Sequence, residues 1–277
     1  MIPVIAVAGP KGRLGSWLVK QGLSPLRCDI TKRSQVEKAI AKLKPDVIIN
    51  CAAFTAVDAA EDIANFDRVM SVNMRGPATL RQSFGGLLVQ LSTGFVFDGK
   101  SGPNGEEDEI GPVNVYGYSK WAGELAATMR EPTLVVRVLD LFGPNVIERP
   151  DFVRQIRDLL ELGTEKELPD TLYGTPTYIP HLSDALLEAI SREMTGVIHI
   201  AGDLTLSRYE WGRNIAEIFG HDPDLIKPTG EITGAAPRPL KGGLRVDKAN
   251  ELGLPIHSPI RGLISLRDLE RASGAAA

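Results

Sequence analysis

A tyrosine and a lysine four residues apart, Tyr116 and Lys120, are the residues best suited to acid–base chemistry. On a helix this spacing places both side chains on one face, where the ammonium can act on the phenol. A free tyrosine has a pKa of about 10 and exchanges protons poorly at neutral pH. A nearby cation favours the phenolate and lowers that pKa, which makes the pair a usable general acid or base. The alternative is a surface helix that carries both residues without a chemical role.

A glycine-rich turn after the first apolar run is the second such feature. Residues 4–8 (VIAVA) predict a strand, and GxxGxxG spacing follows at Gly9, Gly12 and Gly15, before a helix predicted over 16–21. The first Gly permits a tight turn, the second lets a phosphate approach the backbone, and the third lets helix and strand pack closely. The helix N-terminus adds free N–H groups. This context predicts a dinucleotide site, with an ordinary strand-to-helix turn as the alternative.

The bulk composition excludes several classes of protein. The chain has 277 residues, enough for one large or two unequal domains. Its net charge of −4 argues against a nucleic-acid partner. No apolar run approaches the ~20 residues that a membrane span needs. The only cysteines, Cys28 and Cys51, have no metal-ligand spacing and indicate a reducing compartment. We therefore predict a cytoplasmic protein that binds no membrane.

Strands and helices alternate through about residue 142. Apolar runs predict strands over 25–28, 46–50, 88–92 and 133–139. Between them we predict a helix over 36–43 with a capping box at 34–37, and a helix over 59–72 that is broken near Asn73. The alternation is typical of an α/β fold with a doubly wound parallel sheet, of the Rossmann kind. We predict a dinucleotide-binding domain over 1–142, to which about 179–200 returns. A smaller, mixed substrate-binding domain would comprise 143–178 and 201–277.

Small or hydroxyl-bearing residues follow two of the predicted strands. Residues 51–58 read CAAFTAVD, and residues 92–99 read STGFVFDG. The carboxyl ends of parallel strands are the usual ligand position in such sheets, and small residues leave room there for a cofactor. The hydroxyls of Ser92 and Thr93 can point at a ligand or bond their own turn. The acidic run at 106–109 suggests a cation site, but we interpret it as solvated charge.

Four motifs in this order resemble the extended short-chain dehydrogenases/reductases. More narrowly, GxxGxxG, CAAFTAVD, STGFVFDG and YGYSK are similar to the dTDP-4-dehydrorhamnose reductase family, which carries NAAxTAVDxAE, STDYVFDG and VYGxSKxxGE. Later matches are Arg137 with Phe142-Gly143, YGTPTY at 173–178, GVIHIAGD at 196–203 and PRPLKGGLRVDK at 237–248. The resemblance therefore covers nearly the whole chain.

The resemblance implies a hydride transfer from NADPH or NADH to C4 of a nucleotide-linked 4-keto-6-deoxy sugar. Tyr116 would protonate the alkoxide, Lys120 would lower the pKa of Tyr116 and bind the nicotinamide ribose, and Thr93 would polarise the carbonyl. The implied cofactor-binding residues are Gly9, Gly12, Arg13, Leu14, Gly15, Asp29, Ile30, Ala52, Ala53, Phe54, Tyr116 and Lys120. The implied substrate-binding residues are Thr55, Val57, Thr93, Phe95, Asp140 and Arg238. We predict no metal site, and a homodimer remains open.

Two positions depart from the family's pattern where the sugar is expected. Gly94 stands in place of the Asp of STDYVFDG, and Asp140 stands where a Trp follows the Arg of RTSW. The first alternative is that Asp140 takes over the role of the Asp lost at position 94, or pairs with a nearby Arg. The second is that it meets a hydroxyl group of the sugar. In the second case the pocket would prefer a more hydroxylated sugar or another 4-keto-6-deoxy sugar. We would then expect Asp140→Trp to improve the reduction of dTDP-4-dehydrorhamnose.

Two further alternatives stay open. The predicted second strand is short, so the residue that selects NADPH or NADH has no clear position. Arg27, Lys32 and Arg33 are candidates to bind a 2′-phosphate, or they are simply solvated. The resemblance also extends to the regulatory subunit of methionine adenosyltransferase. A non-catalytic, NADP-binding regulatory subunit is therefore the alternative function.

Overall fold

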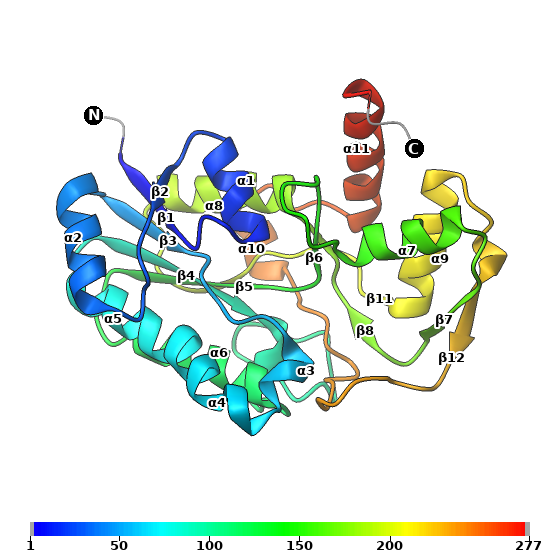
Figure 1. The fold of residues 1–277 in the computed structure, drawn as a ribbon, viewed down its shortest axis with the longest axis horizontal. Coiled ribbons are helices and arrows are strands. Elements are labelled where there is room, and N and C mark those ends of the chain that lie inside the picture. Colours follow the sequence, from blue (N-terminus) through cyan, green and yellow to red (C-terminus); the bar gives the residue numbers. More distant parts are fainter. Residues whose placement is uncertain (1–2, 275–277) are drawn as a thin grey trace.

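The computed structural model describes residues 3–274, and one six-stranded parallel sheet organises it (Figure 1). The strand order is β2-β1-β3-β4-β5-β10. The bounds are β1 (Ile5–Ala8), β2 (Ser24–Leu26), β3 (Val47–Asn50), β4 (Leu87–Thr93), β5 (Thr133–Val138) and β10 (Gly196–His199). The order reverses between β1 and β3, and doubly wound sheets bind ligands at such a switch point. The predicted α/β class with a doubly wound parallel sheet is confirmed.

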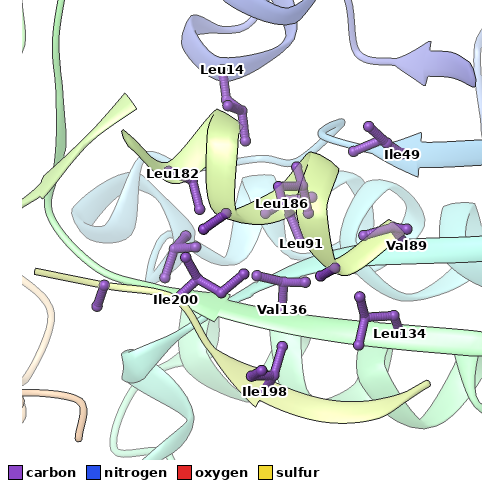
Figure 2. Packing of buried hydrophobic residues seen from close by; sticks show 14 of the residues in the cluster. Leu14, Ile49, Val89, Leu91, Leu134, Val136, Leu182, Leu186, Ile198 and Ile200 are labelled. Atoms are coloured by element: carbon purple, nitrogen blue, oxygen red, sulfur yellow. The ribbon is translucent and has the colours of Figure 1, made fainter. Parts of the chain in front are cut away.

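Helices cover both faces of this sheet. One face carries α1 (Arg13–Lys20) and α8 (Ile179–Ser191), and the other carries α2 (Arg33–Leu43), α5 (Gly76–Ser83) and α6 (Val115–Ala127). Ile49 and Val89 face α1 and α8, as Figure 2 shows, whereas their neighbours Ile48 and Leu88 face the opposite core. Successive strand residues point to opposite faces, so both faces are buried. This is why the strands are continuously apolar in sequence.

The chain between β3 and β4 begins with the non-helical stretch 51–56 and is then mostly helical. It comprises α3 (Val57–Ala60), α4 (Ile63–Met70), a π-helical turn (Ser71–Arg75) and α5. The predicted break near Asn73 is therefore a π-helical turn, a feature that often marks functional sites. The predicted capping box at 34–37 is wrong, because α2 begins at Arg33 and its N-cap Lys32 makes no side-chain cap.

The remaining elements enclose a second, smaller core beside the sheet. The helices of this core are α7 (Phe152–Glu161), α9 (Arg208–Phe219) and α11 (Pro259–Ala272), whereas α10 (Asp247–Glu251) packs its Ala249 into the core of the main sheet. The short strand pairs are β6 (Leu141–Phe142) with β9 (Thr177–Tyr178), β7 (Lys166–Pro169) with β12 (Ile226–Thr229), and β8 (Tyr173–Gly174) with β11 (Leu206–Ser207). Phe142 and Trp211 are at the centre of this core, with ring centroids 5.2 Å apart. These short strands lack the continuous apolar runs that predicted the strands of the main sheet, so the sequence did not predict them.

Two features are absent from residues 3–274. No helix there is both long and apolar enough to cross a membrane. In the same part of the chain, no three His, Cys, Asp or Glu side chains gather in a way that could hold a metal ion. The domain boundaries stay a prediction.

Candidate active site

The helix that carries Tyr116 and Lys120, α6, is held very close to its neighbours. A Cβ at Gly117 would lie 2.2 Å from the carbonyl oxygen of Phe95, and one at Gly123 would lie 2.1 Å from that of Asn73. The two glycines therefore let α6 approach the turn after β4 on one side and the π-helical turn on the other. Asn114 caps the helix by accepting a hydrogen bond from Gly117 N at 2.7 Å.

Both side chains of the predicted acid–base pair are buried. Burial raises the pKa of Tyr116 to about 12, and a hydrogen bond with Thr93 opposes that rise. Burial lowers the pKa of Lys120 to about 8, while the carboxylate of Glu124 raises it. Lys120 donates to the carbonyl of Leu91 at 2.6 Å. The expected lowering of the tyrosine pKa by Lys120 is therefore not seen in this structure, because burial dominates.

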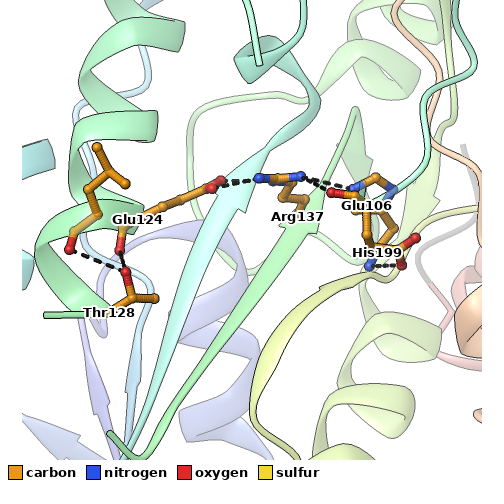
Figure 3. Close-up of polar contacts among 6 residues, drawn as sticks. Glu106, Glu124, Thr128, Arg137 and His199 are labelled. Carbon is orange, nitrogen blue, oxygen red and sulfur yellow. Dashed lines mark hydrogen bonds and ion pairs between the residues drawn. The ribbon is translucent and has the colours of Figure 1, made fainter. Parts of the chain in front are cut away.

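A buried network of hydrogen bonds and an ion pair connects α6 with β5 and β10 (Figure 3). Arg137 Nε and Nη2 donate to the two carboxylate oxygens of Glu124 at 3.0 and 2.8 Å. Arg137 also lies 3.5 Å from His199 Nε2, and Glu106 accepts from the backbone N–H of His199 at 2.8 Å. Glu106 thus belongs to this network, which corrects our interpretation of the whole acidic run as solvated charge. The network fixes the helix one turn beyond Lys120.

Asn73, in the π-helical turn, is a positioning residue that the sequence did not reveal. Its Oδ1 accepts from Phe54 N at 2.7 Å, and its Nδ2 donates to Phe54 O at 3.0 Å. The same Nδ2 donates to Ser119 Oγ on α6 at 2.9 Å. Asn73 therefore ties the segment after β3 to the Tyr116 helix. Its place next to Gly76-Pro77, where we predicted only a break, was the available signal.

The three glycines of the GxxGxxG turn differ in what surrounds them. Gly9 has φ +74°, and a Cβ there would lie 2.6 Å from Ala52 N. A Cβ at Gly15 would lie 2.2 Å from Gly9 O. A Cβ at Gly12 would meet only Gly9 O, at 3.5 Å. The fold therefore requires Gly9 and Gly15, whereas the space in front of Gly12 is open to a ligand, as a pyrophosphate would need.

Two adjoining cavities occupy the carboxyl ends of the strands. The first, of about 620 Å³, is lined by the predicted residues Gly9, Gly12, Asp29, Ile30, Ala52 and Ala53. The second, of about 600 Å³, is lined by the predicted residues Gly12, Arg13, Leu14, Gly15, Ala53, Thr55, Val57, Thr93, Phe95, Tyr116, Lys120, Asp140 and Arg238. Phe54 lines neither cavity, since Asn73 holds its backbone and its ring packs near Tyr116.

The residues of these cavities fit a dinucleotide. Gly12, Cys51 and Ala53 line both cavities, so together the cavities run from Asp29 to Tyr116. Ser92 Oγ is buried in the second cavity and has no hydrogen-bond partner among residues 3–274. A buried hydroxyl without a partner is costly, and a bound ligand would satisfy it.

Charged residues line the end of the second cavity where the sugar is expected. The carboxylate of Asp140 pairs with the guanidinium of Arg208, which also lies over the Phe152 ring at 4.9 Å. Arg238 pairs with Asp58 at 2.7 Å. Asp140 is therefore paired with an Arg, which is the first of the two alternatives drawn from the sequence. Arg208 was missed because its partner lies 68 positions away.

Gly94 lies in an apolar setting at the same end. A Cβ at this position would contact Leu244 Cδ2 at 3.3 Å and Leu139 at 3.4 Å. A carboxylate there would be buried against leucines, at a cost in free energy. A third cavity, of about 40 Å³, adjoins Gly94, Asp140 and Arg208. The apolar residues around Gly94 therefore suit a glycine at this position better than the Asp of the family's pattern.

Comparisons with known proteins agree on one family. The family model described as RmlD substrate binding domain matches residues 4–262. A dTDP-4-dehydrorhamnose reductase of Mycolicibacterium smegmatis is 32% identical, over 93% of this chain and 81% of that protein. The beta subunit of methionine adenosyltransferase 2 from Danio rerio is 30% identical, over 84% of this chain and 75% of that protein.

A solved structure has the same fold over almost all of its length. It is the dTDP-4-dehydrorhamnose reductase of Bacillus anthracis in complex with NADP, with a TM-score of 0.89 and 27% identity. The alignment covers 96% of this chain and 99% of that one. The extended short-chain dehydrogenase/reductase resemblance is thus confirmed, and the chain belongs to the RmlD family, that of the dTDP-4-dehydrorhamnose reductases.

Proposed function

We propose that this protein uses NADPH or NADH to reduce the 4-keto group of a nucleotide-linked 4-keto-6-deoxy sugar. The observation that carries the proposal is the convergence of Thr93, Tyr116 and Lys120 on one cavity that adjoins the GxxGxxG turn. A hydride donor and a proton donor must act on the same carbonyl. The proposed groups therefore need to meet in one place.

The bound cofactor would supply the hydride, and the chain's own residues would orient the reactants and supply the proton. Thr93 would donate a hydrogen bond to the carbonyl oxygen. Tyr116 has a pKa of about 12, so its phenol is protonated at neutral pH and can donate to the forming alkoxide. Lys120 would hold the nicotinamide ribose and sustain the hydrogen bonding around the phenol.

The substrate end supports a sugar nucleotide. Arg208 and Arg238 line the cavity beyond Thr93, and guanidinium groups bind phosphate and hydroxyl oxygens well. We place dTDP-4-dehydrorhamnose first among the candidate substrates because the reductase relatives bear that name. A cytoplasmic location and a homodimer are further predictions.

The test is NADPH oxidation followed with a panel of nucleotide-linked 4-keto sugars. We expect turnover of at least one, and its loss in Tyr116→Phe. Tyr118→Phe is the matched control, because Tyr118 lies two residues along α6 and is 50% exposed. Tight NADPH binding without turnover of any keto sugar would instead support the regulatory-subunit function.

A further inference from the structure

The chain returns from the smaller core to the main sheet along residues 234–241, which we call the return segment. It follows β12 and runs back toward α3, as Figure 1 shows. The segment has neither helix nor strand of its own, so other elements must hold it in place. Two of its residues, Arg238 and Pro239, line cavities at the sugar end. Whatever fixes the return segment therefore also fixes this end of the pocket.

Asp58, in α3, holds the return segment at two points. Its Oδ1 accepts from the backbone N–H of Ala236 at 3.1 Å, and its Oδ2 accepts from Arg238 Nη2 at 2.7 Å. Burial raises the pKa of Asp58, but these hydrogen bonds together outweigh burial and lower the pKa, so the carboxylate stays ionised at neutral pH. A Cβ at Gly234 would lie 2.5 Å from Asp58 Oδ1. The return segment therefore packs directly against the carboxylate.

Two further contacts attach the return segment to the elements around the sheet. Asn114 Oδ1 caps α6 by accepting from Gly117 N, and Asn114 Nδ2 donates to the carbonyl of Pro237 at 2.8 Å. In the loop after β4, the carbonyl of Gly99 accepts from Lys241 N at 2.8 Å. With Asp58 this makes three attachments, and one of them is the cap of the helix that carries the proposed proton donor.

The attachment to Asp58 leaves most of the Arg238 guanidinium free for a ligand. A guanidinium has five N–H groups. One donates to Asp58 and one to the carbonyl of Ala236 at 3.4 Å, which leaves three without a partner among residues 3–274. The Arg238 side chain is 14% exposed and that of Asp58 is 48% exposed. Asp58 therefore contacts the guanidinium from the solvent side, and the free N–H groups suit the diphosphate of a sugar nucleotide.

We propose that Asp58 is a positioning residue for the sugar nucleotide, because it holds Arg238 and the return segment against the second cavity before the ligand binds. This inference rests on the proposed function. An arginine that is already ordered loses less side-chain entropy on binding, so the ligand binds more tightly. Asp58 takes no part in the proton transfer from Tyr116. Its loss should therefore raise KM and spare kcat.

The test is steady-state kinetics of Asp58→Asn with a nucleotide-linked 4-keto sugar that the wild type reduces. We expect KM for the sugar nucleotide to rise about 10- to 100-fold, the usual effect of losing a hydrogen bond between charged groups. The kcat and the Kd for NADPH should stay nearly unchanged. Asp224→Asn is the matched control, because Asp224 also pairs with an arginine, Arg213 at 3.1 Å, and neither residue lines the three cavities.

A double variant separates positioning from a general structural role. If Asp58 acts through Arg238, Asp58→Asn should add nothing to the KM of Arg238→Gln. Asn114→Asp keeps the oxygen that caps α6 and removes the donor to the return segment. It should raise KM by a smaller factor, about 2- to 10-fold for a neutral hydrogen bond. Amide exchange at Ala236 should be faster in Asp58→Asn, because its N–H loses a charged acceptor.

Three results would overturn the inference. They are an unchanged KM in Asp58→Asn, a loss of NADPH affinity equal to the rise in KM, or additive KM effects in the double variant. If the wild type reduces no keto sugar, the proposed function fails, and titration of dTDP into the NADP⁺-loaded protein tests this inference separately. Asp58→Asn should then weaken dTDP binding about tenfold. An unchanged dTDP affinity would refute the positioning role.

Discussion

The cofactor end and the sugar end of the two adjoining cavities are shaped by different kinds of contact. At the cofactor end, close backbone contacts shape the site, such as Gly15 against the carbonyl of Gly9. At the sugar end, long charged side chains form ion pairs, Asp140 with Arg208 and Asp58 with Arg238. The shape of the cofactor end depends on glycines that have no side chain, whereas the shape of the sugar end depends on charged side chains that pair with one another.

This difference decides how each end responds to change. A backbone contact has no substitute, so a new side chain there removes binding or folding outright. An ion pair can lose one partner and still leave a cavity, although the remaining charge is then unsatisfied. We therefore expect steep losses at the cofactor end and graded losses at the sugar end.

The largest effect on binding is expected from Gly12→Val. Gly12 has φ −75° and ψ 166°, which any residue adopts, and its front is open, so the protein should fold. The valine would occupy the space for the pyrophosphate, and calorimetry should detect no NADPH binding. Gly85→Val is the control, because a Cβ at Gly85 meets nothing within 4 Å. If folded Gly12→Val bound NADPH with unchanged affinity, the expected steep loss at the cofactor end would be wrong.

For turnover, the largest expected effect belongs to Tyr116→Phe. The substitution keeps the ring against Phe95, at a centroid distance of 5.7 Å, and removes only the hydroxyl. We expect kcat to fall about 10²–10⁴-fold, as for loss of a general acid, with the Kd for NADPH nearly unchanged. A full rate in this variant would move the proton donor elsewhere.

A smaller effect is expected from Asp140→Trp at the sugar end. The sequence suggested that this change improves turnover, but the structure reverses that expectation because Arg208 would lose its partner. Trp would also adopt φ +48°, a conformation that suits Asp better. We expect kcat/KM for dTDP-4-dehydrorhamnose to fall about 10- to 100-fold, with cofactor affinity kept. An increase would instead support a pocket tuned to a more hydroxylated sugar.

The smallest predicted effect is a pH dependence of NADPH binding. Lys120 has a pKa of about 8, so its ammonium is present below that pH and is lost above it. Affinity should therefore weaken about tenfold as the pH rises through this value, the size expected for a hydrogen bond from a charged group. In Lys120→Met the affinity should be lower and should not vary across this range. If the affinity of Lys120→Met still fell as the pH rises through about 8, the pH dependence would belong to another titrating group.

Local patterns in the sequence were enough to predict most of the cofactor end. The GxxGxxG turn, the strand-end motifs and the Tyr116–Lys120 spacing each lie within one segment, and the structure brings them to adjoining cavities. The strands were predictable because burial on both faces leaves continuous apolar runs.

Tertiary contacts account for what the sequence could not predict. Arg208 joins Asp140 across 68 positions, and Asn73 joins Ser119 across 46. No spacing rule connects residues so far apart. The pKa of Tyr116 was also misjudged for this reason, since the effect of burial depends on packing that a single helix does not reveal.

The Asp140–Arg208 pair has a consequence for how this pocket can evolve. Asp140 lies in the bend between β5 and β6, and Arg208 begins α9. A mutation of either residue alone leaves the opposite charge without its partner. A lineage that moves toward an apolar pocket must therefore cross an intermediate of low fitness or change both codons together. Substrate range would then shift in jumps rather than by gradual drift, and the two positions should be varied jointly in any directed-evolution library.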